Sequence, residues 1–129
     1  MRLLHDPALV LVVDDTANVR ELIRVNLALE GFEVRVASDG QEALDLVPEL
    51  LPDLITMDVV MPRVDGLTAA TRLKTNPATS SIPIVMVTAR AQTADRDKGR
   101  RAGVDAYITK PFEPSELVET VRNLLDSRR

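Results

Sequence analysis

The feature that most constrains the fold is a fivefold alternation between short strand-like runs and longer segments with a helical pattern. Parallel strands need a crossover connection between them, which a helix normally supplies. The alternation therefore predicts an α/β fold with helices on both faces of a parallel sheet. The predicted strands are residues 8–13, 32–37, 54–57, 83–88 and 104–109, and the predicted helices are about 17–30, 40–47, 66–75, 92–102 and 114–127.

Hydrophobic patterning separates the central strands from an edge strand. The first, third and fourth predicted strands are almost continuously apolar, as expected of strands that are covered on both faces. Residues 32–37 instead alternate, with Glu33 and Arg35 standing between apolar side chains. We therefore expect the second strand to lie at an edge of the sheet.

Capping and proline signals mark the ends of two predicted helices. Asp39 followed by Glu42 is a capping-box-like start for the second helix, and Pro114 suits the first turn of the last helix. Pro48 lacks the N–H that a helix interior uses, and its ring clashes with the preceding turn. We therefore expect the second helix to end or kink near Val47.

Size and composition favour one domain. The 129 residues, of which 45% are hydrophobic, suffice for a single domain over residues 1–129, with an N-terminal tail over residues 1–7. The chain has no cysteine, which rules out a disulfide framework and a thiolate metal site. The apolar run near the N-terminus is only about seven residues, too short for a signal peptide or a membrane span. We expect a soluble, cytoplasmic protein without a membrane partner.

The charge balance argues against a nucleic-acid surface. The formal net charge is −4, and the chain has one Tyr, two Phe and no Trp. Binding to phosphates requires clustered Lys and Arg, and base stacking requires aromatic platforms. We therefore expect no direct contact with nucleic acid.

Polar residues gather where four of the predicted strands end. Asp14 and Asp15 follow the first strand, Asp58 follows the third, Thr88 ends the fourth and Lys110 follows the fifth. Ligands of open α/β sheets bind outside the carboxyl ends of the strands. We therefore expect these side chains to meet in one crevice.

Three carboxylates in one crevice favour a divalent cation. Neighbouring negative charges raise one another's pKa unless a cation neutralises them. Mg²⁺, or Mn²⁺ in its place, suits the site because Mg²⁺ prefers oxygen ligands, keeps several waters and shares substrate phosphates. Asp58 is ionised at neutral pH, since a free Asp has a pKa of about 3.9, and it needs no general base to attack a phosphoryl group. The cation, Lys110 and Thr88 would supply countercharge and hydrogen bonds.

These residues lie in motifs that closely resemble the receiver domain of two-component response regulators. The motifs are VVDD at 12–15, MDVVMPRVDG at 57–66, MVTA at 86–89 and YITKPF at 107–112, and the resemblance runs from about Val10 to Leu125. It implies a doubly wound, five-stranded parallel sheet of the flavodoxin-like (βα)5 type, with strand order 2-1-3-4-5.

The resemblance also implies a role for each site residue. Asp58 would be the phosphoacceptor, and Asp15 and Asp58 would bind Mg²⁺ directly. Asp14 would act through a water molecule, and the backbone carbonyl of Val60 would complete the coordination. Thr88 would swing toward the phosphoryl group, Lys110 would pair with it and Tyr107 would change rotamer, while the Lys110–Pro111 bond would be cis.

The fourth predicted helix departs from the family pattern. Arg100 stands where members often carry an apolar residue, which leaves Ala91, Ala94 and Ala102 as the apolar contribution. We therefore expect a loosely held helix. Its surface would be basic through Arg96, Lys98, Arg100 and Arg101.

The implied function is that of a signalling module rather than an enzyme with a separate substrate. It would take a phosphoryl group from a sensor histidine kinase or a histidine phosphotransfer protein and catalyse its own phosphorylation and dephosphorylation. The face formed by the fourth helix, fifth strand and fifth helix would then signal to a downstream protein target or output domain. We expect a monomer or a weak, phosphorylation-dependent dimer.

Two other functions fit the residues less well. A haloacid-dehalogenase-like, Mg²⁺-dependent phosphatase or phosphotransferase needs a carboxylate two residues after the nucleophile, where this chain has Val60. A flavodoxin-like FMN binder needs a Ser, Thr and Gly-rich loop after the first strand, which is absent. Both a free-standing regulator and a receiver cut from a longer chain fit the sequence, and we favour the free-standing form because no linker follows the last helix.

Overall fold

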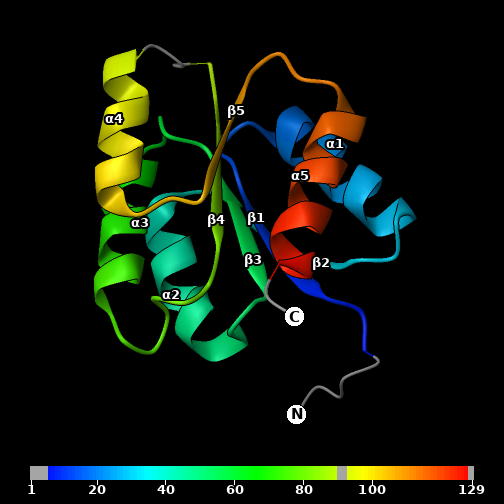
Figure 1. Ribbon diagram of the computed structural model, residues 1–129, viewed down its shortest axis with the longest axis horizontal. Coiled ribbons are helices and arrows are strands. Elements are labelled where there is room, and N and C mark those ends of the chain that lie inside the picture. The colour runs from blue at the N-terminus through cyan, green and yellow to red at the C-terminus, as the bar shows by residue number, and fades with distance from the viewer. Residues whose placement is uncertain (1–5, 90–92, 128–129) are drawn as a thin grey trace.

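The computed structural model describes residues 6–89 and 93–127, so most of the predicted N-terminal tail lies outside this range. Within it, five parallel strands form one sheet in the order β2-β1-β3-β4-β5, flanked by five helices (Figure 1). This order confirms the predicted doubly wound, flavodoxin-like sheet. No described helix combines the length and apolarity that a membrane span needs. The strands are β1 (Leu9–Val13), β2 (Glu33–Ala37), β3 (Leu54–Met57), β4 (Ile84–Thr88) and β5 (Ala106–Thr109), and the helices are α1 (Ala17–Leu29), α2 (Gly40–Leu50), α3 (Gly66–Thr75), α4 (Thr93–Ala102) and α5 (Pro114–Asp126).

Side chains of the central strands alternate between two hydrophobic clusters, one on each face of the sheet. Leu11 and Ile55 belong to the cluster under α2 and α3, whereas Val12 and Val85 belong to the cluster under α1 and α5. Figure 1 shows α2, α3 and α4 on one side of the sheet and α1 and α5 on the other. The helices contribute Ala43, Val47, Ala69, Ala70 and Leu73 to the first cluster and Ile23, Leu27, Leu117 and Val121 to the second.

Burial confirms the predicted centre and edge of the sheet. Every residue of β1, β3 and β4 is buried, while β2 exposes Glu33, Arg35 and Val36. Because β2 pairs only with β1, its outer margin has no strand neighbour in the described range. The charged residues that alternate with apolar ones in β2 are therefore found on an edge strand that is partly open to solvent.

The strands end nearly level at one margin of the sheet. Val13 pairs with Ala37 on one side and with Met57 on the other, and Thr88 pairs with Thr109. The residues that follow these strand ends are therefore brought together by the register of the sheet.

Helix α2 does not end near Val47, as the sequence predicted, but continues through Pro48 to Leu50. Pro48 lies in the last turn, where its missing N–H removes a single intrahelical hydrogen bond. The end is instead set by Leu51, which adopts a left-handed conformation (φ 45°) and donates its N–H to the carbonyl of Val47 at 2.8 Å.

Strand β5 begins at Ala106 rather than at residue 104, and the preceding Asp105 binds the start of β4 through both its backbone N–H and its side chain. The Asp105 carboxylate accepts the backbone N–H of Ile84 at 2.8 Å and the Nζ of Lys74 at 3.0 Å. Lys74 lies in α3, so this contact ties the helix to the start of two strands.

The predicted loose packing of α4 stays a prediction. Ala91 lies outside the described residues, and the side chain of Ala94 is not described either. Ala102 is half-buried, and Gly99 is buried.

Thr56 provides a test of core packing. Its side chain is 1% exposed, and its Oγ1 has no hydrogen-bond partner among the described residues. Burial of an unpaired hydroxyl is unfavourable. We expect Thr56→Val to raise the free energy of unfolding by about 1 kcal/mol, measured by urea denaturation.

Thr79→Val is the matched control for this prediction. Thr79 is equally buried, but its Oγ1 donates to the carbonyl of Leu73 at 2.7 Å. The same substitution should therefore lower the free energy of unfolding by about 1 kcal/mol. A change of the same sign in both variants would contradict the role assigned to the unpaired hydroxyl.

Candidate functional site

The sheet itself positions three of the predicted site residues. Each follows a strand and donates its backbone N–H to the end of the neighbouring strand: Asp14 to the carbonyl of Ala37 at 3.2 Å, and Asp58 to that of Val13 at 3.0 Å. Lys110 donates in the same way to the carbonyl of Thr88 at 2.8 Å. The backbone positions of the site are therefore fixed by strand pairing rather than by flexible loops.

The three predicted carboxylates lie together. Asp14, Asp15 and Asp58 each offer an oxygen, and these atoms all lie within 4.8 Å of one another. Asp14 is 1% exposed and Asp58 is 7% exposed, whereas Asp15 is exposed. The cluster thus has two buried members and one that faces solvent.

The ammonium group of Lys110 lies between the two buried carboxylates. Its Nζ is 2.9 Å from Oδ2 of Asp14 and 3.3 Å from Oδ2 of Asp58. Burial lowers the pKa of Lys110, but the hydrogen bonds and charges of Asp14 and Asp58 outweigh this and raise the pKa above its usual value. Lys110 is therefore held in the charged form.

The ionised form of the Asp58 carboxyl group remains disfavoured although the Lys110 ammonium group lies close to it. Burial raises the pKa of Asp58, and the charge of Asp14 raises it further. The charge of Lys110 and the backbone N–H of Val60 act in the opposite direction without cancelling the effect. The pocket therefore carries more negative charge than its own groups neutralise.

Asp14 has both carboxylate oxygens engaged. Oδ2 accepts from Lys110, and Oδ1 accepts the backbone N–H of Thr16 at 2.9 Å. Arg20 also donates to the backbone carbonyl of Asp14 at 2.9 Å. Helix α1 is capped at Thr16, so neither acidic residue serves as its N-cap.

The loop after Asp58 is held closely against the rest of the site. The N–H of Gly66 donates to the carbonyl of Val59 at 2.8 Å, and a Cβ on Gly66 would lie 2.0 Å from the carbonyl oxygen of Asp58. Only glycine allows α3 to begin so near the end of β3. Val60, whose carbonyl was a predicted ligand, is 53% exposed in this loop.

An ion pair that the sequence did not predict fastens this loop to α2. Arg63, with φ of 66°, donates Nε to Oδ2 of Asp39 at 3.0 Å and Nη2 to Oδ1 at 2.9 Å. Asp39 also caps α2 by accepting the N–H of Glu42, and this hydrogen bond together with Arg63 lowers the pKa of Asp39. No local sequence pattern links residue 63 to residue 39.

Thr88 and Tyr107, the predicted switch residues, lie on adjacent strands. Thr88 is fully buried at the end of β4, and Tyr107 is half-buried in β5. The ring of Tyr107 packs on Gly99 of α4, where an added Cβ would lie 2.6 Å from Cε2 of the ring. The Lys110–Pro111 bond is cis, as the resemblance implied.

The sequence matches the family described as the response regulator receiver domain over residues 10–122. The chain belongs to this family. Among its relatives, the receiver is 40% identical over 116 residues to the DNA-binding dual master transcriptional regulator RpaA of Synechocystis, covering 90% of this chain and 48% of that protein. It is 43% identical over 119 residues to the response regulator MprA of Mycolicibacterium vanbaalenii, covering 92% and 51%.

Solved structures agree with this assignment. The receiver domain of the Francisella response regulator 1452 superposes with a TM-score of 0.89 at 31% identity, covering 95% of this chain and 99% of that one. The chemotaxis protein CheY4 of Vibrio cholerae gives a TM-score of 0.86 at 31% identity, covering 91% and 98%.

The relatives bear on the predicted absence of nucleic-acid contact. This receiver spans about half the length of the curated relatives it matches. Some of those relatives are described as DNA-binding or transcriptional regulators. Their names do not support the expectation that direct nucleic-acid contact is absent.

Asp58→Asn tests the charge balance of the pocket. Because the native pKa of Asp58 is raised, the native state holds this proton more tightly than the unfolded chain does. The contribution to stability is therefore present below the unfolded pKa of about 3.9 and is lost as the pH rises through the native pKa. We expect Asp58→Asn to be more stable than the wild type at pH 7 without Mg²⁺, by an amount that shrinks toward pH 3, in urea unfolding at each pH.

Mg²⁺ provides the companion measurement. A cation that binds only the native state stabilises by about 2.7 kcal/mol at 100 times its Kd. The wild type should gain stability with Mg²⁺, and Asp58→Asn should gain less. An Asn variant less stable than the wild type at pH 7, or equal gains from Mg²⁺, would contradict the charge assignment.

Gly99→Ala tests the contact between the Tyr107 ring and helix α4. Alanine normally stabilises a helix interior by about 1 kcal/mol relative to glycine. Here the added Cβ meets the ring, so we expect no such gain and a shift of the Tyr107 ring resonances in NMR spectra. In a Tyr107→Ala background the gain should return. A full gain with unshifted Tyr107 resonances would show that the contact is unimportant.

Proposed function

We propose that this receiver accepts a phosphoryl group on Asp58 from the phosphohistidine of a sensor histidine kinase or histidine phosphotransfer protein. The observation that carries the proposal is a buried Asp58 carboxylate 3.3 Å from the Lys110 ammonium, beside two further carboxylates. Phosphoryl transfer requires mainly positioning and countercharge, and this arrangement offers both. The cytoplasmic location stays a prediction.

The donor set fits a hard divalent cation, Mg²⁺ or Mn²⁺. Three carboxylate oxygens lie within 4.8 Å of one another, and the surplus negative charge raises the pKa of Asp58. Asp15 and Asp58, with the backbone carbonyl of Val60, would hold the cation directly. Asp14 would hold it through water, because its oxygens already accept from Thr16 and Lys110. Bound Mg²⁺ supplies positive charge for the carboxylates and for phosphoryl oxygens.

The reaction itself would use residues already in place. A carboxylate oxygen of Asp58 attacks phosphorus, the P–N bond to the donor imidazole breaks, and the bond's electron pair leaves with the imidazole, which takes up a proton. Asp58 becomes an acyl phosphate. Lys110 and the Thr88 hydroxyl would bind phosphoryl oxygens. The charge of Lys110 together with that of a bound cation would favour the ionised form of Asp58, so no general base would be required.

The signal would pass through β4 and β5. A Thr88 hydroxyl drawn toward the phosphoryl group leaves space near Tyr107, whose ring lies between β5 and Gly99 of α4. The phosphorylated state would then favour a second packing of the α4-β5-α5 face, read by a downstream protein target or output domain. A monomer or a weak, phosphorylation-dependent dimer is compatible with this scheme.

The receiver would act on itself, catalysing its own phosphorylation and dephosphorylation. Membership of the receiver family disfavours the haloacid-dehalogenase alternative. That alternative also needs a carboxylate at the position of Val60, which an exposed valine does not supply.

Asp58→Asn is the direct test. We expect the variant to incorporate no base-labile phosphate from labelled acetyl phosphate or phosphoramidate with Mg²⁺ present, because the amide is a poor nucleophile. Asp45→Asn, which alters an exposed carboxylate on α2, should incorporate label like the wild type. Label at the wild-type level in Asp58→Asn would refute the acceptor assignment.

A further inference from the structure

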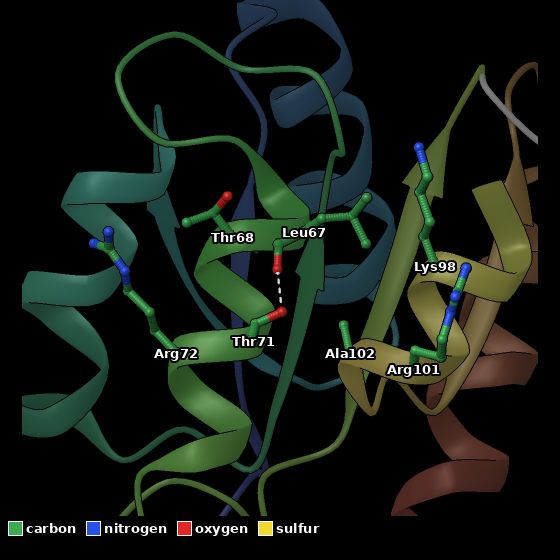
Figure 2. A pocket seen from close by; sticks show the side chains of 7 residues that line it. All are labelled: Leu67, Thr68, Thr71, Arg72, Lys98, Arg101 and Ala102. Atoms are coloured by element: carbon green, nitrogen blue, oxygen red, sulfur yellow. Dashed lines mark hydrogen bonds between the residues drawn. The ribbon is translucent and has the colours of Figure 1, made fainter.

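A groove between α3 and α4 lies outside the site described above (Figure 2). Its volume is about 540 Å³, and three of its lining residues are cationic: Arg72 of α3 and Lys98 and Arg101 of α4. Figure 2 shows Leu67 pointing from α3 toward α4, with Ala102 on the side of α4 nearest to α3. Figure 2 also shows the Arg72 side chain pointing away from α4, so the positive charge that faces the apolar surface between the helices comes from Lys98 and Arg101 on the α4 side.

No carboxylate among the described side chains pairs with these positive charges. Among the described side chains, which leave out those of residues 90–95, neither Arg72 nor Lys98 forms an ion pair or a hydrogen bond, and the Nε of Arg101 donates only to the backbone carbonyl of Asp97, at 3.4 Å. The Asp97 carboxylate pairs instead with Arg100 at 3.6 Å. Cationic side chains therefore gather at this groove although the chain has a net charge of −4.

Two other carboxylates near the helices are engaged elsewhere. Asp65 accepts the N–H of Thr68 and so caps α3, and Asp105 binds Lys74 at 3.0 Å. The Thr71 hydroxyl in the groove donates to the carbonyl of Leu67 at 2.8 Å. The groove therefore offers positive charge and apolar surface, and these neighbouring polar groups already have hydrogen-bond or ion-pair partners.

We propose that this α3–α4 groove docks an acidic amphipathic helix of a partner protein. A helix laid between two parallel ridges places one apolar stripe on the floor. Glu or Asp side chains on the flank that faces α4 then meet Lys98 and Arg101. Complementary charge of this kind sets orientation and speeds association.

The groove is separate from the usual output face on the other side of α4. Arg96 and Arg100 line a different hollow, shared with Val104 and Tyr107. Helix α4 therefore presents two basic faces, one toward β5 and one toward α3. This division supplies a matched control, since the same charge change can be made on either face of one helix.

The experiment uses a synthetic helical peptide of about 15 residues, with leucines on one face and glutamates on both flanks. Binding to the unphosphorylated protein is followed by fluorescence anisotropy at low salt and by amide shifts in NMR spectra. We expect shifts concentrated in α3 and α4, and affinity lowered by about tenfold in Lys98→Glu/Arg101→Glu. Arg96→Glu/Arg100→Glu should lower it by no more than about threefold.

Three results would overturn the proposal. One is no binding by a wild-type protein whose spectrum is that of a folded chain. Another is an equal loss of peptide affinity in the two double variants, which would indicate non-specific electrostatic attraction. Binding of a scrambled peptide of the same composition with unchanged affinity would indicate the same. The third is preference for a DNA duplex over the peptide through Lys98 and Arg101. Because no phosphorylation is involved, such failure would leave the function of Asp58 untouched.

Discussion

The contact of the Lys110 ammonium with two buried carboxylates is the interaction on which the site depends. Moving a carboxylate out of water is costly unless a paired charge compensates, and Lys110 lies 2.9 Å from Asp14 and 3.3 Å from Asp58. Compensation is incomplete, because the pKa of Asp58 remains raised. The ion pairs with Lys110 therefore stabilise the two buried carboxylates, and the remaining negative charge favours binding of a further cation.

Sequence reasoning located this site because parallel strands impose a simple geometry. Once the alternation of strands and helices is recognised, the residues just after the strand ends must share one margin of the sheet. Asp14, Asp58, Thr88 and Lys110 could be chosen on this basis alone. Their positions then follow from backbone hydrogen bonds between neighbouring strands, such as Asp58 N–H to Val13 carbonyl at 3.0 Å.

Particular contacts between elements could not be predicted in the same way. The packing of Tyr107 on Gly99 and the pairing of Arg63 with Asp39 have no periodic signal. The effect of Pro48 was also misjudged, because a proline in a final helical turn removes only one hydrogen bond and the true end is set by Leu51. Patterns reveal which face a residue takes, but not its partner there.

The Arg63–Asp39 pair has a consequence for how such chains diversify. Its two hydrogen bonds join the loop after Asp58 to the start of α2, where Asp39 also accepts the N–H of Glu42 and Arg63, among the described residues, has only this contact with the carboxylate. A lineage that lost the carboxylate would have no reason to retain the guanidinium, whereas the carboxylate would still cap α2 after loss of the guanidinium. Among descendants of a common ancestor, arginine at position 63 should therefore occur together with a carboxylate at position 39, while the carboxylate should also occur without the arginine.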